Sequence, residues 1–514
     1  MKRSSTRIAF SILTLLLFTA AANAAVVGDV REWRRAHAKP IIEDLVSLVS
    51  IPNVARDAAD IEKNAAKIES MFRARGVTTR LLRVEGAPPV VFGRLDTPGA
   101  TRTVVFYAHY DGQPAVATQG WKSAPWTPVL RDGLLDQGAR DLPWSALDGK
   151  IDPEWRIYAR SVSDDKAPII AILAALDALK ATGHPPTVNL RFLFEGEEEA
   201  GSPHLAEILT QNRDLLHADA WLFCDGPVHQ SRRLQVVFGA RGVTGLELTV
   251  YGPTRALHSG HYGNWAPNPA SMLSNLLASM RDDDGRVLID GFYDRVRPLS
   301  TTEKAAVAAI PDVDEELRHD LGLARSEAND ARLVERIMIP AMNIRGLESA
   351  SVGENARNAI PTEARASIDF RLVPDVTPAV VHGLVEAHLR KKGYFIVHDA
   401  PDQATRLAHP KIVRLDWDEG YPGFRTPMDL TVSKAVITAI QETSGDEIVK
   451  LPILGGSLPL EMFDRIFGVP LIVTPMVNHD NNQHAANENL RIANLWEGID
   501  MMANLMARLG RLWR

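Results

Sequence analysis

The stretch VNLRFLFEGEEE, residues 188–199, begins as an apolar run and ends in a cluster of carboxylates. The run at 188–194 predicts a strand buried in a sheet. Clustered carboxylates repel one another and normally lie on a solvated surface, yet these directly follow a buried strand. A bound cation would offset their charge. The stretch therefore indicates a sheet with a metal site at one edge.

The sequence on either side of this stretch contains further apolar runs. Short β-branched runs at 90–92 and 104–107 predict further strands, and the Ala- and Leu-rich run at 169–176 predicts a buried helix between strands. Strands that alternate with helices predict an α/β core with a largely parallel sheet. Ligand sites on such sheets lie outside the carboxyl ends of the strands.

The pattern changes near residue 239, where an inserted α+β domain is expected. Alternating or β-branched runs predict strands at 243–250, 337–339 and 366–370, and 377–392 reads as a helix. Before the core, 29–80 reads as helical. After the insertion, a helix from Leu430, a strand at 471–473 and a final helix from Asn489 are expected. The expected division is 1–24 signal peptide, 25–242 and 416–514 catalytic domain, and 243–415 inserted domain.

Composition narrows the function classes. The 514 residues are 45% hydrophobic and 24% charged, which is ordinary for a globular protein and excludes disordered, collagenous and coiled-coil classes. The single cysteine, Cys224, excludes an internal disulfide framework and a thiolate-rich metal site. The net charge of −7 argues against nucleic acid as a partner, because phosphate binding needs a basic surface.

The first 24 residues resemble a secretory signal peptide. Lys2, Arg3 and Arg7 precede an apolar run at 8–22, and Ala22-Asn23-Ala24 reads as a cleavage site. A membrane anchor is the alternative, but the run is short for a span, and no later stretch reaches the ~18 apolar residues that a transmembrane helix needs. We expect an exported protein, periplasmic or secreted, with no membrane span after cleavage.

Five groups of His or carboxylate residues follow predicted elements. Singly each has an ordinary explanation; the acidic residues at 163–166, for example, could cap a helix. Together they describe a dinuclear hydrolytic site, in which one Asp is shared between two metals that each have a further His and carboxylate. A spare Glu could take the proton of the attacking water. The groups are His109 with Asp111, 163–166, 195–199, Asp225 and 484–488.

The chain resembles the dizinc metallopeptidase family of carnosinase, cytosolic non-specific dipeptidase, aminoacylase, glutamate carboxypeptidase and succinyl-diaminopimelate desuccinylase. It is most similar to the carnosinase-type dipeptidase branch, from about residue 40 to the C-terminus. The resemblance implies a three-layer α/β catalytic domain and a ferredoxin-like inserted lid and dimerisation domain, hence a homodimer. The matching segments are HYDGQPA at 109–115, WKSAP at 121–125, SDDK at 163–166, GEEEAGS at 196–202, LHSG at 257–260, IP at 360–361, RLVP at 371–374, GGSLP at 455–459 and HAANE at 484–488.

The resemblance also implies roles at the metal centre. His109 and Asp225 would bind one zinc, Glu199 and His484 the other, and Asp164 would bridge them; Mn²⁺ or Co²⁺ also suits these ligands. The peptide bond between Asp164 and Asp165 is commonly cis in the family. Glu198 would be the general base, and Asp111 would orient His109.

Further residues are implied to contact substrate. His258, often contributed by the partner subunit in the family, would stabilise the oxyanion. Arg371 would hold the free carboxylate of the substrate. Asn358, Gly456 and Ser457 are candidate substrate-binding residues.

One departure concerns specificity. The dipeptidase branch has Arg-Glu before its Gly-Gly-Ser, and that Glu would receive the substrate's amino group; here Ile453-Leu454 stand there. We expect a hydrolase for dipeptides or short peptides with a free carboxylate, and an N-acyl-amino-acid deacylase is the alternative. A catalytically silent peptide-binding protein is disfavoured because all five ligands and the base are present. A serine hydrolase is disfavoured because no Gly-x-Ser-x-Gly occurs.

Overall fold

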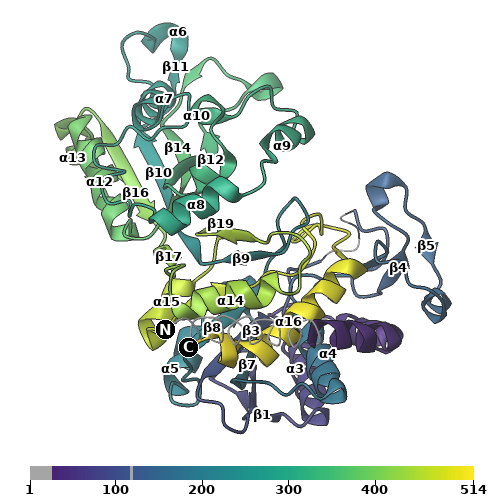
Figure 1. Ribbon diagram of the computed structural model, residues 1–514. Coiled ribbons are helices and arrows are strands. Elements are labelled where there is room, and N and C mark those ends of the chain that lie inside the picture. Colours follow the sequence, from purple (N-terminus) through teal and green to yellow (C-terminus); the bar gives the residue numbers. More distant parts are fainter. Residues whose placement is uncertain (1–25, 116–117, 119) are drawn as a thin grey trace, which may run out of the picture.

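The computed structural model describes residues 26–115, 118 and 120–514, so the expected signal peptide lies outside the described residues. The chain forms two lobes (Figure 1). The lower lobe contains the N-terminal and C-terminal parts of the chain, and the upper lobe is built from the segment between them. Within the described ranges, no helix is long and apolar enough to cross a membrane.

An eight-stranded sheet lies at the centre of the lower lobe. Its order is β1-β2-β7-β3-β8-β20-β9-β18. The sheet is parallel through its middle strands, β7, β3, β8 and β20, whereas β1, β2 and β7 pair antiparallel at one edge. The expected largely parallel sheet is therefore confirmed only for the centre. The strands are β1 (Thr78–Leu82), β2 (Val90–Leu95), β3 (Thr103–His109), β7 (Asn189–Glu195), β8 (Ala220–Phe223), β9 (Gln235–Val237), β18 (Val449–Leu451) and β20 (Leu471–Val473).

Helices cover both faces of this sheet, which gives three layers. Successive side chains of a strand point to opposite faces, and in β3 both sets are buried: Val104 and Phe106 join one apolar core, and Val105 and Tyr107 join the other. On the first face pack α2 (Ala38–Val49), α3 (Ala58–Ala74), α4 (Lys166–Thr182), α14 (Thr431–Gln441) and α16 (Ile492–Leu512). On the second face pack α5 (Leu205–Gln211) and α15 (Leu460–Phe467).

A smaller antiparallel sheet, with the order β21-β6-β4-β5, projects from the lower lobe (Figure 1). No pattern in the sequence predicted it, because its strands are only two or three residues long. One of them, β21, comprises the first three residues of the expected final helix. Helix α16 therefore begins at Ile492 instead of Asn489. The strands are β4 (Val129–Arg131), β5 (Asp141–Leu142), β6 (Arg156–Tyr158) and β21 (Asn489–Arg491), with 3-10 turns η1 (Leu135–Gln137) and η2 (Trp144–Asp148) nearby.

The upper lobe has the expected ferredoxin-like arrangement. Strands β10, β12, β14 and β16 alternate with helices α7 and α12 along the chain in the order βαββαβ, and lie side by side as β12-β14-β10-β16. The expected domain boundary at 242/243 lies inside β10, which runs from one lobe into the other. The boundary expected at 415/416 lies inside β16. The elements are β10 (Gly239–Tyr251), α7 (Pro269–Met280), β12 (Ala341–Glu348), β14 (Glu363–Leu372), α12 (Pro378–Lys391), β15 (Phe395–Val397), α13 (Gln403–Ala408) and β16 (Ile412–Trp417).

Two expected elements are wrong. Residues 337–339 do not form a strand, because α11 ends at Ile337 and β12 begins at Ala341; so short an apolar run does not separate helix from strand. The expected helical segment 29–80 is broken after Val49, and its end already belongs to β1. The remaining elements are β11 (Leu257–His258), α6 (Ser259–Tyr262), α8 (Thr301–Ala309), α9 (Asp314–Asp320), α10 (Glu327–Asp330), α11 (Leu333–Ile337), η4 (Gly353–Asn355), β13 (Ala359–Ile360), β17 (Phe424–Arg425) and β19 (Leu454–Ser457).

Candidate metal centre and active site

The centre lies at the carboxyl ends of the parallel strands. His109 is the last residue of β3, and Asp225 follows β8 by two residues. Glu199 lies in the 3-10 turn η3 (Glu198–Ala200) just after β7. Asp164 precedes α4, and His484 lies in the loop between β20 and β21. Neighbouring parallel strands end at the same edge of a sheet, so the fold brings these residues together.

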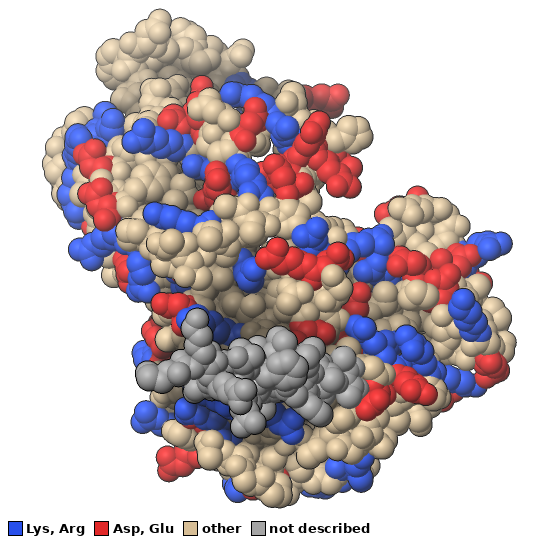
Figure 2. Space-filling model, viewed as in Figure 1, with Lys and Arg blue, Asp and Glu red and all other residues tan. Residues whose placement is uncertain are grey.

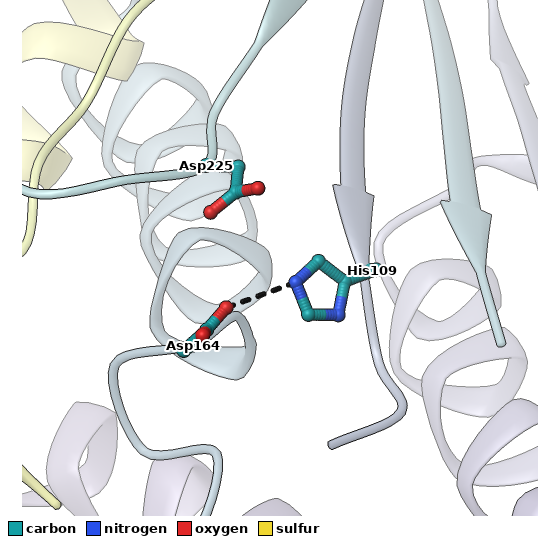
Figure 3. A group of neighbouring side chains, drawn as sticks. All are labelled: His109, Asp164 and Asp225. Atoms are coloured by element: carbon teal, nitrogen blue, oxygen red, sulfur yellow. Dashed lines mark hydrogen bonds and ion pairs between the residues drawn. The ribbon is translucent and has the colours of Figure 1, made fainter. Parts of the chain in front are cut away.

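Two groups of ligand atoms share one aspartate. His109, Asp164 and Asp225 form one group, and Asp164, Glu199 and His484 form the other; within each group the ligand atoms lie within 4.8 Å of one another. In Figure 3, Asp164 and Asp225 extend toward the ring of His109 from two different loops. The Nε2 of His109 lies 3.0 Å from Asp164 Oδ1, and the Nε2 of His484 lies 3.0 Å from Asp164 Oδ2. Asp164 therefore faces one histidine with each oxygen, as a bridging carboxylate does.

The donor set fits divalent metal ions. The buried Oδ2 of Asp164 has no hydrogen-bond partner among the described residues, although His484 is close to it. His484 Nε2 also lies 3.2 Å from Glu199 Oε2, so Asp164, Glu199 and His484 turn potential ligand atoms toward one another. Imidazole nitrogens and carboxylate oxygens in this mixture suit zinc, manganese or cobalt.

Burial makes the carboxylates of this region costly to ionise. It raises the pKa of Asp225 to about 7, with the charge of Asp164 adding to the effect. Burial likewise raises the pKa of Glu195, at the end of β7, to about 7. For Asp164, burial also acts upward, but the imidazoles of His109 and His484, each 3.0 Å from one of its oxygens, outweigh burial and hold its pKa well below the usual range. Cations at the two groups would stabilise the ionised carboxylates.

Asp111 connects His109 with the turn that holds the expected base. Its Oδ1 lies 3.3 Å from His109 Nδ1 and accepts a hydrogen bond from the backbone N–H of Glu198 at 3.1 Å. Its Oδ2 accepts a hydrogen bond from the N–H of Glu199 at 3.0 Å. Asp111 thus fixes the orientation of one ligand and the position of the base. Burial raises the pKa of Glu198; His109 opposes this effect and Asp225 adds to it.

The peptide bond between Asp164 and Asp165 is cis, as the resemblance implied. A residue without an assigned role, Glu488, holds the backbone on the other side of this bond. The fully buried Glu488 accepts hydrogen bonds from the backbone N–H groups of Ser161, Ser163 and Asp164, at 2.9 to 3.0 Å. Its Oε2 also accepts one from Arg160 Nη1 at 2.8 Å. Glu488 is the last residue of the motif at 484–488, but its hydrogen-bond partners cannot be predicted from that motif.

Replacing Glu488 with Ala should lower both stability and metal affinity. The change leaves the buried guanidinium of Arg160 without its partner, which costs about 3–5 kcal/mol of the free energy of unfolding, and it frees the backbone that positions Asp164. Denaturant unfolding and the metal content after dialysis would measure the two effects. Glu447→Ala, at an exposed ion pair with Lys450, is the control and should change neither. Equal stability of the two variants would contradict this role for Glu488.

The structure also joins Arg371 to strand β19. Arg371 Nη1 donates a hydrogen bond to Ser457 Oγ at 2.9 Å, and its Nε donates one to Asp369 Oδ2 at 2.8 Å. Ser457 lines a cavity of about 490 Å³ together with Glu198 and Glu199, and Gly456 is exposed beside it. The expected carboxylate-binding residues therefore lie next to the metal centre.

His258 and Asn358 lie elsewhere in this chain. His258 is in β11 and pairs with Ala359 of β13, and the carbonyl of Asn358 accepts a hydrogen bond from the N–H of Ser259 at 3.0 Å. Both side chains are exposed at the end of the upper lobe that carries α6, far from the strand ends of the lower lobe (Figure 1). Within one chain the fold does not bring them to the metal centre.

The chain is similar to known peptidases in sequence and in structure. A model of the family described as Peptidase family M20/M25/M40 matches residues 105–508. The Cys-Gly metallodipeptidase dug1 of Schizosaccharomyces pombe is 27% identical over 427 residues, which are 82% of this chain and 83% of that protein. The Beta-Ala-His dipeptidase of Homo sapiens is 27% identical over 434 residues, 83% of this chain and 78% of that protein. The crystal structure of an M20 family metallo-carboxypeptidase, Sso-CP2 from Sulfolobus solfataricus, has a TM-score of 0.72 at 26% identity and covers 92% of this chain and 99% of that chain.

Proposed function

Because this chain belongs to peptidase family M20/M25/M40 and is a metal-dependent hydrolase, we propose that it is a dinuclear-zinc dipeptidase. Its substrates are dipeptides or short peptides with a free C-terminal carboxylate. The observation that carries the proposal is the shared carboxylate of Asp164, which belongs to both groups of ligand atoms. The names of the two relatives, both dipeptidases, support the substrate class.

Each residue of the centre has a task in amide hydrolysis. Two bound ions would polarise the scissile carbonyl and lower the pKa of a water molecule, so that hydroxide is available near neutral pH. The carboxylate of Glu198 takes the proton from this water and passes it to the leaving amine. Asp111 holds Glu198 in place through the hydrogen bond with its N–H. Arg371 binds the substrate's carboxylate with its guanidinium, for which bidentate geometry is favourable.

The free amino group of a dipeptide requires an acidic partner. Leu454, in the position of the family's Glu, is half-buried and packs against the apolar core. The cavity beside Glu198 offers another carboxylate, that of the exposed Glu419; Glu461 also lines the cavity but is in an ion pair with Arg465 at 3.6 Å. An ammonium group there gains attraction that an acylated nitrogen lacks. We therefore infer that free dipeptides are better substrates than N-acyl amino acids.

Hydrolysis of two matched substrate sets tests this function. One set contains free dipeptides, and the other carries the same C-terminal residues behind N-acyl groups; mass spectrometry follows cleavage by the zinc-loaded protein. We expect kcat/KM at least about tenfold higher for the free dipeptides. Faster cleavage of the acylated set would make the protein a deacylase. Cleavage of neither set would point to a peptide-binding protein.

We also propose that the protein acts as a homodimer through the upper lobe. On the face drawn in Figure 2, the end of this lobe that carries α6 shows almost no charged side chains, and Trp265, three residues after α6, is 79% exposed. A second copy covering this apolar surface could bring its His258 to the metal centre of the first, where it would stabilise the oxyanion. A sedimentation mass of one chain at working concentration would contradict the dimer.

We also propose that the protein is exported after cleavage of a signal peptide. The pattern of residues 1–24 supports this, because it combines a basic start, an apolar run and a small-residue cleavage site. Mass spectrometry of the intact protein, purified from the native host, should give a chain that begins at Ala25. A chain that retains its first 24 residues would contradict cleavage.

A further inference from the structure

A second cavity of about 540 Å³ lies in the upper lobe, between β12 and the short helices α9, α10 and α11. We call it the arginine cavity. Its apolar wall includes Leu321, Leu333, Ile337 and Met342, and Arg241 lines it from β10. Its volume is typical of a ligand site, and such sites combine an apolar wall with a few placed polar groups.

Arg241 places this cavity directly beside the expected carboxylate-binding residue. In the upper sheet, Val243 of β10 is paired with Arg371 of β14. Residues two apart on a strand share a face, so the side chains of Arg241 and Arg371 leave the same face as diagonal neighbours. Both reach strand β19: Arg241 Nε donates a hydrogen bond to the carbonyl of Gly455 at 3.0 Å, and Arg371 Nη1 donates one to Ser457 Oγ.

The charge of the arginine cavity is unbalanced. Five arginines and only two acidic residues, Asp314 and Glu327, line it. Three of the arginines are in ion pairs. They are Arg281 with Glu327, Arg318 with Asp330 and Arg325 with Asp284. The other two, Arg241 and Arg336, have no carboxylate partner among the described residues, although neither is fully exposed.

Arg241 is the less favourably placed of these two. It is half-buried, and the nearby carboxylate of Asp369 is bound to Arg371. Burial and the neighbouring charge of Arg371 lower the pKa of Arg241 to about 10. A partly buried cation without a partner is costly. An anion bound between the two guanidiniums would remove that cost.

We propose that the arginine cavity receives the side chain of the substrate's C-terminal residue, and that Arg241 selects side chains that end in a carboxylate. The inference rests on the proposed function, in which Arg371 holds the C-terminal carboxylate itself. The two carboxylates of a C-terminal aspartate or glutamate are only a few bonds apart, which matches two neighbouring guanidiniums. The apolar wall contacts the methylene groups of the side chain. The substrate class is therefore the dipeptides with a C-terminal acidic residue.

Two dipeptides of nearly the same shape, Ala-Glu and Ala-Gln, test this selection on the metal-loaded protein. For the wild type we expect kcat/KM for Ala-Glu to exceed that for Ala-Gln by about 10- to 100-fold, as for a charge-assisted hydrogen bond. Arg241→Met should reduce this ratio to near one. The control is Arg345→Met, on the same sheet but paired with Glu247 and outside the cavity, which should keep the wild-type ratio.

Two results would overturn the inference. One is a wild-type ratio near one, which does not depend on whether the variant folds. The other is an Arg241→Met protein in which both dipeptides lose the same factor, as for a purely structural residue. If neither dipeptide is cleaved, the proposed function fails, and calorimetric binding to Glu198→Ala protein decides the inference separately. Tighter binding of Ala-Glu would support it, and equal or absent binding would overturn it.

Discussion

Replacing Glu198 with Ala is expected to lower kcat by about 10²- to 10⁴-fold, the usual contribution of a general base, while both metal ions stay bound. Glu198 belongs to neither group of ligand atoms, so its removal leaves both intact. The N–H of residue 198 would still donate to Asp111, so the turn should keep its position. Steady-state kinetics and metal analysis of the same preparation measure the two effects.

The neighbouring residue provides the matched control. Glu199→Ala removes a side chain of the same length from the same turn, but one whose Oε2 lies 3.2 Å from His484. This variant should lose metal as well as activity. A Glu198→Ala protein that keeps more than a tenth of the wild-type kcat would remove the assigned base. A Glu198→Ala protein that has lost metal would make Glu198 a ligand instead.

Replacing Asp164 with Ala is expected to empty both metal positions, because its two oxygens face His109 and His484 separately. Activity should fall by at least about 10³-fold, since the bound ions contribute several kcal/mol to the stabilisation of the transition state. Metal content per chain after dialysis against a weak chelator is the direct measurement.

Asp225→Ala distinguishes a shared ligand from an ordinary one. Asp225 belongs only to the group with His109, so its replacement should release one ion per chain and leave the other. Complete chelation of the wild type should abolish activity, and added zinc, manganese or cobalt should restore it. If Asp164→Ala and Asp225→Ala lose the same number of ions, Asp164 is not the bridge. If chelated protein stays active, the reaction does not need these ions.

Much of the fold was predictable from local pattern. The run at 188–194 and the Ala-rich run at 169–176 became β7 and α4 because burial on all sides leaves a clear apolar signal in the sequence. The inserted α+β block was also recognised by its alternating strands. The short strands of the small sheet could not be predicted, since two or three residues carry no measurable period. The apolar run at 337–339 was assigned wrongly for the same reason.

The candidate site divides in a similar way. The residue types and their places after strands indicated a metal site, and the family motifs supplied a role for each residue. The hydrogen-bond partners of Glu488 could not be predicted from the sequence, because Arg160 and Ser161 lie more than 300 positions earlier. The neighbourhood of Arg241 and Arg371 depends on the register of β10 with β14.

The sequence by itself determined the long buried strands and helices, such as β7 and α4, and the chemical groups that stand at their ends. It did so because hydrophobic periodicity and short motifs act over a few residues and survive in one dimension. Only the tertiary structure decided that Asp164 faces two histidines and that His258 lies apart from the centre of its own chain. It also decided that Arg241 has no carboxylate partner in the part of the chain that the structure describes. These facts arise from strand register and from packing between distant segments, and no local pattern in a single chain encodes the distance between two such segments.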